Sequence, residues 1–378
     1  MVGVPFNASD LISVTAYSFG AAPAAPQPWP AAGVSLIDPL SPCYSPMETV
    51  GARMQNRFFR LFDIWLYVRH PFLMLSYFRN MGYWPRPSLP RNYNEKMLWR
   101  RLFDHDPRLP QRIDKLRCKE HVREAFPDIR LPATLWQGSD PALIPAALLA
   151  GSCVVKANHG SGWNLLVHDG RFDRRQLTRK ARKWMRRRYY GRGRMQWGYR
   201  DIAPRLFVEE MVMHGGRPVD REYKCYMARD RCIYVYMKVD RFGENPLDVL
   251  FDPDGNSRIT ECSGRYFSVH HDRPGNWKAI LAAAARMARE FDSVRVDLYE
   301  TDGEIWFSEY TFYSEGGYDS IDWPKVVAQQ GELWDLRRSW FLSTDHSGLR
   351  QIYRNRLKTH LDWSAPQGAQ PARATKGG

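Results

Sequence analysis

Residues 293–313, SVRVDLYETDGEIWFSEYTFY, constrain the fold of this chain more than any other segment. Two runs rich in β-branched and aromatic residues flank the dipeptide Asp302-Gly303, which is typical of a two-residue hairpin turn. Asp297 and Glu309 lie at similar distances from that turn, one on each run. Because the side chains of a strand alternate between its two faces, the spacing predicts that these carboxylates are direct or diagonal neighbours across the hairpin.

The pair Asp297 and Glu309 carries a chemical prediction. Neighbouring carboxylates repel each other, and a bridging cation relieves that repulsion. A few carboxylate oxygens with room for phosphate oxygens are ligands that suit Mg²⁺. Arg295 shares a strand face with Asp297, where it could neutralise a phosphate. The competing interpretation is a solvent-exposed hairpin face whose charges are satisfied, and the hairpin alone leaves both interpretations open.

A second informative segment is VVKANHGSG, residues 154–162. Lys156 ends a short apolar run, and two glycines follow it before the next apolar run, NLLV. The runs SCVVKAN and NLLVHDG predict two strands around a loop. Glycine lets backbone N–H groups approach phosphate oxygens closely, and lysine adds a positive charge. The pattern indicates an anion-binding loop, and the competing interpretation of Lys156 is an ordinary surface lysine.

Charge favours an acidic partner for this chain. Its 378 residues contain 55 Lys and Arg against 41 Asp and Glu, a net charge of +14. Such a balance suits nucleic acid, anionic lipid, a nucleotide or an acidic polymer. Residues 171–194 hold twelve of these basic residues and one acid, and they predict a basic helix over 174–189. That helix is either a solvated face or a polyanion-binding face, to which Trp184, Tyr189 and Tyr190 would add stacking surfaces.

The N-terminal part does not predict a secretory signal, because the first 30 residues carry Asp10 but no Lys or Arg. Residues 57–78 are the most apolar stretch, but Arg60 and Asp63 are among the residues that interrupt it, so it does not predict a membrane span. It predicts an amphipathic helix that packs on its own protein or, alternatively, lies in a membrane interface. The six cysteines lack zinc-ligand spacing, which favours a reduced, cytosolic setting.

Six segments, taken together and in this order, resemble the TupA-like (teichuronopeptide-biosynthesis-type) ATP-grasp amidoligases. The resemblance covers roughly residues 92–330, and it rests on the ordered set because no single piece is specific. The segments are YNEKMLW (93–99), IDKLRCKEHV (113–122), VVKANHGSGWN (154–164), APRLFVEEMV (203–212), EYKCYM (222–227) and VRVDLYETDGEIWFSEYTF with two following glycines (294–317).

The resemblance implies an α+β ATP-grasp fold, in which two α+β subdomains hold ATP between antiparallel sheets. It also implies roles for particular residues. The residues implied for ATP are Lys115 and Lys156 at the phosphates, His159, Gly160, Ser161 and Gly162 in a mobile loop, Glu209, Glu210, Met211 and Val212 at the adenine edge, and Glu222 at the ribose.

The resemblance further assigns Mg²⁺ to Asp297, Glu309 and Thr311. Thr311 departs from the superfamily, where asparagine is commonest at this position, so one or two ions are both compatible with the sequence. Arg295 is implied to steady an acyl-phosphate, and Lys224 to contact phosphate. The implied reaction is ATP-dependent amide formation between a carboxylate and an amine, and it requires no side-chain nucleophile. This agrees with the absence from the sequence of a G-x-S-x-G motif or a convincing Cys–His pair.

The implied setting is bacterial cell-surface polysaccharide biosynthesis, in the cytoplasm or at the inner face of the cell membrane. An acidic glycan or its precursor and an amine or amino acid are then the expected partners, ahead of nucleic acid. Two other functions stay open: phosphate transfer to a sugar hydroxyl, and polyanion binding without catalysis. The expected division is a disordered Ala/Pro-rich segment (1–54), a helical region (55–110), an ATP-grasp domain (111–345, with a lid at 151–213 and a carboxylate subdomain at 214–345), and a C-terminal helix with a disordered tail (346–378).

Overall fold

The structure is a computed structural model that describes residues 50–191, 193–239, 247–258, 273–318 and 324–363. The chain divides into two units after Phe58, and the first unit contributes only the start of one helix to the described residues. That helix, α1 (Val50–Arg69), begins earlier than residue 55, where the helical region was predicted to start. The disorder predicted for the N-terminal segment and for the tail falls almost entirely on residues 1–49 and 364–378, which lie outside the described residues.

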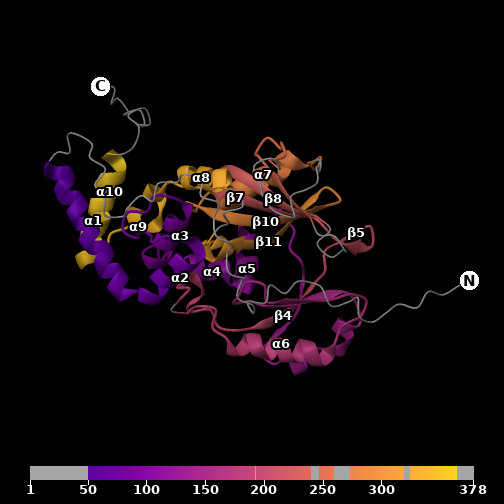
Figure 1. Ribbon diagram of the computed structural model, residues 1–378. Coiled ribbons are helices and arrows are strands. Elements are labelled where there is room, and N and C mark those ends of the chain that lie inside the picture. The colour runs from indigo at the N-terminus through magenta and orange to yellow at the C-terminus, as the bar shows by residue number, and fades with distance from the viewer. Residues whose placement is uncertain (1–49, 192, 240–246, 259–272, 319–323, 364–378) are drawn as a thin grey trace, which may run out of the picture. The chain divides into compact units, whose positions relative to one another are not determined.

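Five antiparallel strands form the larger sheet of the second unit, in the order β11-β10-β7-β8-β9 (Figure 1). The turn between β10 and β11 has Asp302 at φ 55° and Gly303 at φ 81°, as a type I′ hairpin requires. The hairpin that the sequence predicts is therefore confirmed. The strands are β7 (Glu222–Ala228), β8 (Arg231–Val239), β9 (Leu247–Phe251), β10 (Val294–Thr301) and β11 (Glu304–Thr311).

The larger sheet buries one face under the alanine-rich helix α7 (Trp277–Ala288). Val294, Val296 and Leu298 alternate along β10 with Arg295 and Asp297, and all three are buried. Because strand side chains alternate, the charged residues of β10 point to the opposite face.

Four antiparallel strands form the smaller sheet, in the order β1-β4-β2-β3. Helix α6 (Arg174–Arg186) covers one of its faces. Leu177 packs with Val155 and Val208, and Ala181 and Trp184 pack with Ala157 and Leu206. The two strands predicted around the glycine loop are β2 and β3. The strands are β1 (Thr134–Gly138), β2 (Cys153–Ala157), β3 (Asn164–Val167) and β4 (Leu206–Glu210), with a separate ribbon of β5 (Met213–His214) and β6 (Arg217–Pro218). The two antiparallel sheets and their helices confirm the α+β class.

Two of the remaining helices begin after a capping residue that their sequences provide. The Asn92 side chain accepts a hydrogen bond from the Glu95 N–H at 3.0 Å, and Asp114 caps the next long helix in the same way. The helices are α2 (Pro71–Met81), α3 (Tyr93–Leu102), α4 (Leu109–Ile113), α5 (Lys115–Ala125), α8 (Pro324–Leu333), α9 (Trp340–Ser343) and α10 (Gly348–Trp363). Short 3₁₀ turns lie at Pro141–Leu143, Ala146–Leu149, Trp197–Tyr199, Ser314–Gly317 and Leu336–Arg338.

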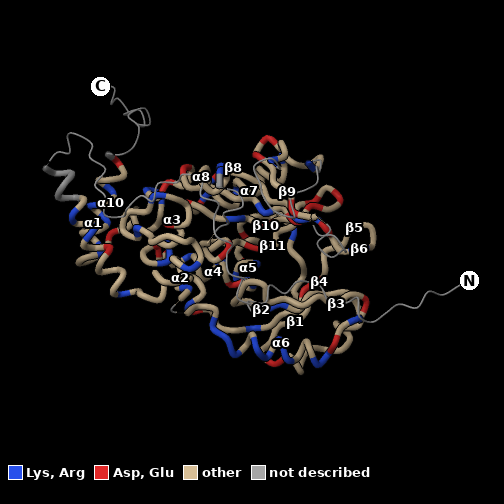
Figure 2. Tube along the Cα trace, viewed as in Figure 1, with Lys and Arg blue, Asp and Glu red and all other residues tan. Residues whose placement is uncertain are grey.

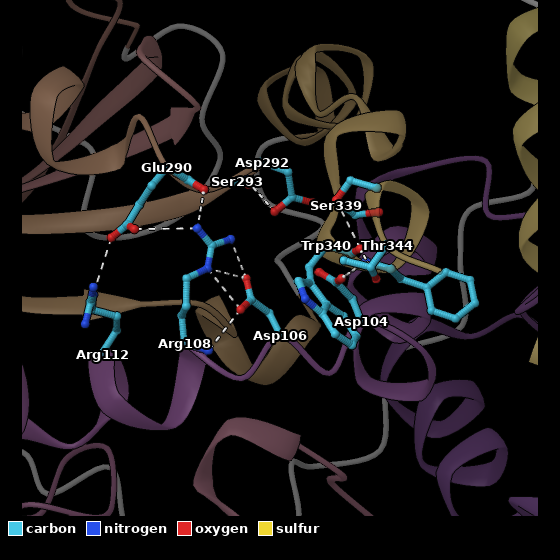
Figure 3. A network of polar contacts seen from close by, with 12 residues as sticks. Asp104, Asp106, Arg108, Arg112, Glu290, Asp292, Ser293, Ser339, Trp340 and Thr344 are labelled. Carbon is cyan, nitrogen blue, oxygen red and sulfur yellow. Dashed lines mark hydrogen bonds and ion pairs between the residues drawn. The ribbon is translucent and has the colours of Figure 1, made fainter. Parts of the chain in front are cut away.

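A polar network joins the end of α3 to distant parts of the chain (Figure 3). Asp104 accepts a hydrogen bond from the Phe341 N–H at 2.8 Å, and Arg100 lies 2.5 Å from Asp292 and 3.8 Å from Asp104. Burial, helped by the nearby Asp292 carboxylate, raises the pKa of Asp104 to about 7. The buried Arg100 therefore pairs closely with Asp292 and more distantly with Asp104, and Asp104 has a pKa near neutral pH.

Candidate active site

The two predicted carboxylates are direct partners across the β10–β11 hairpin, because the register pairs Asp297 with Glu309. This confirms the closer of the two predicted arrangements. The Asp297 side chain is fully buried. Arg295 donates to its two oxygens from Nε and Nη2, both at 2.7 Å, and Lys224 donates to Oδ2 at 2.7 Å. The alternative of a solvent-exposed hairpin face therefore does not hold for Asp297.

Glu309 is the more open of the two carboxylates, with 26% of its side chain exposed. Lys115 Nζ lies 3.1 Å from Oε2, and Arg295 Nη2 lies 3.8 Å from Oε1. Burial raises the pKa of Glu309, but Lys115, Lys224 and Arg295 together outweigh that effect and lower the pKa to about 2. Glu309 is therefore an anion at any pH near neutrality.

Strand β7 adds a third acid to this cluster. Glu222 and Lys224 lie on one face of β7, and Lys224 Nζ lies 2.9 Å from Glu222 Oε2. Glu222 is buried, and the Ser308 hydroxyl donates to its other oxygen at 3.4 Å. Three carboxylates, Glu222, Asp297 and Glu309, thus face three cations, Lys115, Lys224 and Arg295. The balance of charge explains how so many ionic groups are held with little exposure to solvent.

The donor set fits Mg²⁺ in its chemistry. Asp297 and Glu309 supply oxygen ligands side by side, and the described residues contain no cluster of three or more acidic, His or Cys side chains arranged around one ion. Mg²⁺ commonly takes one or two carboxylates and completes its shell with phosphate oxygens and water. Thr311, the third predicted ligand, instead accepts a hydrogen bond from Arg295 Nη2 at 3.0 Å. Glu309 is therefore the more accessible oxygen donor of the three.

A second ionic cluster lies on the smaller sheet. Lys156 and Glu209 point away from α6, because their neighbours Val155 and Val208 pack beneath that helix. Lys156 forms an ion pair with the buried Glu209, and Lys119 Nζ lies 2.6 Å from the other Glu209 oxygen. Burial raises the pKa of Glu209, but the two lysines outweigh it and the pKa is lowered. Glu209 thus holds the predicted phosphate-binding lysine.

Lys119 is a site residue that the sequence reasoning missed. It is buried, and it donates to the Pro132 carbonyl at 2.7 Å as well as to Glu209. Its spacing was the available signal, because residues i and i+4 lie on one face of a helix and Lys115 opens α5. Both lysines of KLRCK therefore turn towards the site.

The glycine loop is fixed at its start by buried polar residues. Asn158 donates to the Asp114 carboxylate at 3.1 Å, and the ring of the buried His159 contacts the Trp184 carbonyl at 3.2 Å. Burial lowers the pKa of His159. Gly162 has φ 70°, a conformation that favours glycine, and a Cβ on Gly160 would meet the Trp163 ring. His159 thus shapes the loop, whereas Ser161 and Gly162 are exposed.

The segment predicted for the adenine edge follows this cluster directly. Glu210 accepts a hydrogen bond from the Ala133 N–H at 2.7 Å. Met211 and Val212 are half-buried and leave β4 towards the β5–β6 ribbon. The backbone of Met211 and Val212 therefore makes no hydrogen bonds within the four-stranded sheet. The structure brings the phosphate, metal and catalytic candidates into two ionic clusters, and Lys115 links the loop to the larger one.

Comparison with known proteins identifies the family. The TupA-like ATPgrasp family matches residues 95–327, more than half of the chain. The chain belongs to the TupA-like ATP-grasp family. The resemblance drawn from the sequence motifs is thereby confirmed, and so is the ATP-grasp fold, whose antiparallel sheets are described above. No curated protein matches the chain.

Several solved structures are similar to this TupA-like ATP-grasp chain at low identity. The ATP-grasp ligase PsnB complexed with minimal precursor is 14% identical, with a TM-score of 0.32, over 60% of this chain and 62% of PsnB. D-alanine–D-alanine ligase from Bacillus anthracis complexed with ATP is 12% identical, with a TM-score of 0.33, over 68% of each chain. The corresponding ligase from Helicobacter pylori is 11% identical, with a TM-score of 0.34, over 59% of this chain and 61% of that one. The chain thus covers about three fifths of the first of them.

The basic helix of this ATP-grasp protein is α6, whose Lys and Arg residues follow its length (Figure 2). Arg175, Arg179 and Arg182 are among its exposed side chains. Trp184 is not available for stacking, which corrects the prediction: it is 7% exposed, because the spacing of Leu177, Ala181 and Trp184 places all three on the inner face.

Proposed function

We propose that this protein is an ATP-dependent ligase that joins a carboxylate to an amine through an acyl-phosphate and releases ADP. The observation that carries the proposal is the Asp297–Glu309 pair, held across the hairpin among Lys115, Lys224 and Arg295. Phosphoryl transfer depends mainly on positioning and on charge stabilisation, and this cluster concentrates fixed charge of both signs.

In this proposal, ATP phosphates bind to Lys115, Lys156 and the loop 159–162. The adenine edge meets the segment from Glu209 to Val212, and Glu222 binds the ribose. Lys156 can turn from Glu209 to a phosphate without exposing a bare buried carboxylate, because Lys119 stays paired with Glu209. Because Glu209 keeps Lys119 as a partner, the free-energy cost of moving Lys156 away from this buried carboxylate is lower.

Asp297 and Glu309 would hold Mg²⁺, which neutralises phosphate charge when it is bound. Thr311 would join them if its hydrogen bond from Arg295 were released. Arg295 orients Asp297 through two hydrogen bonds at 2.7 Å. Lys224 lies between Glu222 and Asp297, and in this proposal its ammonium contacts the transferred phosphate. Arg295 would steady the acyl-phosphate from the same sheet face.

The proposed reaction has two steps. An oxygen of the substrate carboxylate attacks the γ-phosphorus, and the bond to the β,γ-bridging oxygen breaks, which gives an acyl-phosphate and ADP. The amine nitrogen then attacks the acyl carbon, loses a proton and expels inorganic phosphate to leave an amide. The protein contributes orientation and electrostatic stabilisation in both steps.

We further propose that the carboxylate belongs to an acidic glycan or its precursor, and that the amine is an amino acid or a related amine. Membership of the TupA-like family supports a role in bacterial cell-surface polysaccharide biosynthesis, in the cytoplasm near the inner face of the cell membrane. The exposed arginines of α6 provide a positively charged face for such a polyanion.

Nucleotide binding is tested by thermal melting with and without Mg–ATP. ATP at about 100 times its Kd stabilises the folded state by about 2.7 kcal/mol, which raises the Tm by several degrees. We expect the shift to be lost in Lys156→Ala and Asp297→Asn but kept in Lys183→Ala, a control on the exposed face of α6. A wild type that shows no shift would overturn the proposal.

Ligation is tested by ADP release in the presence of acidic glycan fragments and candidate amines. Ligase activity requires both substrates, and hydroxylamine in place of the amine should give a hydroxamate from the acyl-phosphate. ADP release that depends on a sugar but not on an amine would instead identify a phosphotransferase.

A further inference from the structure

Helix α1 is apolar on two opposite sides. Phe59, Phe62 and Leu66 are buried on the inner side. The outer side carries Leu61, Ile64, Trp65 and Val68, whose exposed fractions are 69%, 61%, 45% and 77%. These four residues follow the i, i+3, i+4, i+7 spacing of one helix face. A helix of a water-soluble protein normally places polar side chains there, so this outer face is unexplained by the packing of the described chain.

The apolar surface continues onto α2 and the residue that follows it. The Phe78 ring stacks on Trp84 with centroids 4.5 Å apart, and Tyr67 of α1 lies 5.7 Å from the same Trp84 ring. Trp84 therefore joins the surfaces of the two helices, although 47% of it remains exposed. Eight of the thirteen exposed large apolar side chains of the described residues form this α1–α2 patch: Leu61, Ile64, Trp65, Val68, Phe72, Leu75, Phe78 and Trp84.

The charges around the α1–α2 patch have one sign. Residues 59–95 contain five arginines and two acids, Asp63 and the buried Glu95, which pairs with Arg91. Asp63 is turned inward, where its carboxylate accepts a hydrogen bond from the Ser88 N–H at 2.8 Å. Arg60, Arg69 and Arg79 are exposed on the same two helices. The solvent-facing part of the patch thus combines aromatic and aliphatic side chains with positive charge.

We propose that the α1–α2 patch docks this protein on an anionic membrane surface. Trp, Phe and aliphatic side chains enter the boundary between headgroups and acyl chains, while arginines bind lipid phosphates. None of the described helices has the length and apolarity needed to cross a bilayer, so α1 and α2 lie on the surface. A second copy of the chain is a poorer occupant, because an isologous contact would bring two positively charged patches together.

The proposal does not depend on the proposed function, because binding to vesicles is measured without ATP or substrate.

The test is flotation of the full chain with vesicles of phosphatidylcholine and phosphatidylglycerol, against vesicles of phosphatidylcholine alone. We expect binding to the anionic vesicles, and weaker binding at high salt because screening removes the electrostatic part. The charge variant Arg60→Gln/Arg69→Gln/Arg79→Gln should lower the partition coefficient roughly a hundredfold. Its matched control, Arg174→Gln/Arg175→Gln/Arg179→Gln on α6, should bind as the wild type does.

The apolar part is tested by Ile64→Ser/Val68→Ser, against the control Leu143→Ser/Leu349→Ser at exposed apolar residues elsewhere. We expect vesicle binding to fall about tenfold or more in the first variant alone, with the Tm unchanged in both. A wild type that does not bind the anionic vesicles overturns the proposal. If Ile64→Ser/Val68→Ser then also lowers the Tm, another part of the chain covers the patch; if it dissociates an oligomer in sedimentation, a second copy does. If the α6 variant loses as much vesicle binding as the α1–α2 charge variant, the net positive charge of the chain rather than the patch causes the binding, and the proposal is overturned.

Discussion

Lys115 Nζ lies 3.1 Å from Oε2 of Glu309 and donates a hydrogen bond to the carbonyl of Gly160 at 3.0 Å. One ammonium therefore links the carboxylates of the larger sheet to the glycine loop of the smaller one. The arrangement places a positive charge between the proposed metal ligands and the proposed phosphate loop. Displacement of that ammonium by Mg²⁺ would couple metal binding to the position of the loop.

Glu309→Gln should abolish the effect of Mg²⁺ on ATP binding. The amide keeps the shape of the side chain but removes the negative charge of Glu309, whose pKa is about 2. The proposed site then binds Mg²⁺ more weakly, and the phosphates lose the cation that neutralises them. We expect ADP release to fall about 10²-fold or more, and the Mg-dependent rise in Tm to disappear.

The control for that measurement is Glu304→Gln, on the same strand, where the carboxylate is 44% exposed and pairs with Arg130. Surface pairs of this kind contribute little, so its activity should be that of the wild type. An unimpaired Glu309→Gln variant would mean that the metal, if one binds, does not use this carboxylate.

Removal of Glu209 should destabilise the fold. Glu209→Ala leaves Lys119 and Lys156 close together with no buried counter-charge. Breaking a buried ion pair from one side costs about 3–5 kcal/mol. The midpoint of urea unfolding should fall accordingly. Lys119→Met/Glu209→Leu removes the buried Lys119–Glu209 pair and leaves only Lys156, whose side chain is 16% exposed, so it should recover part of the loss. A Glu209→Ala variant as stable as the wild type would show that water reaches this cluster.

Asp104 should make stability depend on pH. Its pKa is about 7 in the folded protein, above the ordinary value of 3.8, so the folded state binds this proton more tightly than the unfolded state. The stabilising contribution of the Asp104 proton to the free energy of unfolding is fully present below about pH 4 and is lost as the pH rises through about 7. Between about pH 5 and pH 8 the free energy of unfolding should therefore fall by roughly 1–3 kcal/mol.

Asp104→Asn should flatten that dependence, because the amide oxygen still accepts from the Phe341 N–H and Arg100 keeps Asp292. Urea unfolding at the two pH values measures the effect, and Asp345→Asn, at an 88% exposed carboxylate, serves as the control. Equal slopes in the wild type and in Asp104→Asn would assign the pH dependence to another group.

Gly162→Ala should weaken ATP binding more than it weakens the fold. Gly162 has φ 70°, so a Cβ strains the loop even though no atom lies within 4 Å of the ideal Cβ position. The expected result is a smaller Tm shift with Mg–ATP and a nearly unchanged Tm without it. Gly191→Ala is the matched control, because its Cβ also meets open space but its backbone is not in the left-handed region. If Mg–ATP raises the Tm equally in both variants, the glycine loop is not part of the nucleotide site.

The β10–β11 hairpin, the strands around the glycine loop and the basic helix α6 could be predicted from the sequence, because each depends on residues that are close along the chain. Alternation and a central Asp-Gly turn were enough to predict Asp297 and Glu309 as direct or diagonal neighbours, and a register shift between Asp297 and Leu298 makes the pairing direct. The ordered motifs were likewise enough to identify the family. Local geometry thus determined both the secondary structure and the main carboxylate pair.

Only the tertiary structure decided which charges neutralise one another. Lys119 meets Glu209 across ninety positions of the chain, and Lys224 meets Asp297 across seventy-three. The spacing of Trp184 with Leu177 and Ala181 was a signal for its burial that the sequence prediction missed. The outward side of α1 was beyond the sequence, because the pattern of an apolar helix face does not show what covers it. Contacts between distant segments follow from how whole sheets and helices pack, and the free energy of a buried charge depends on those neighbours rather than on the residues beside it in the chain.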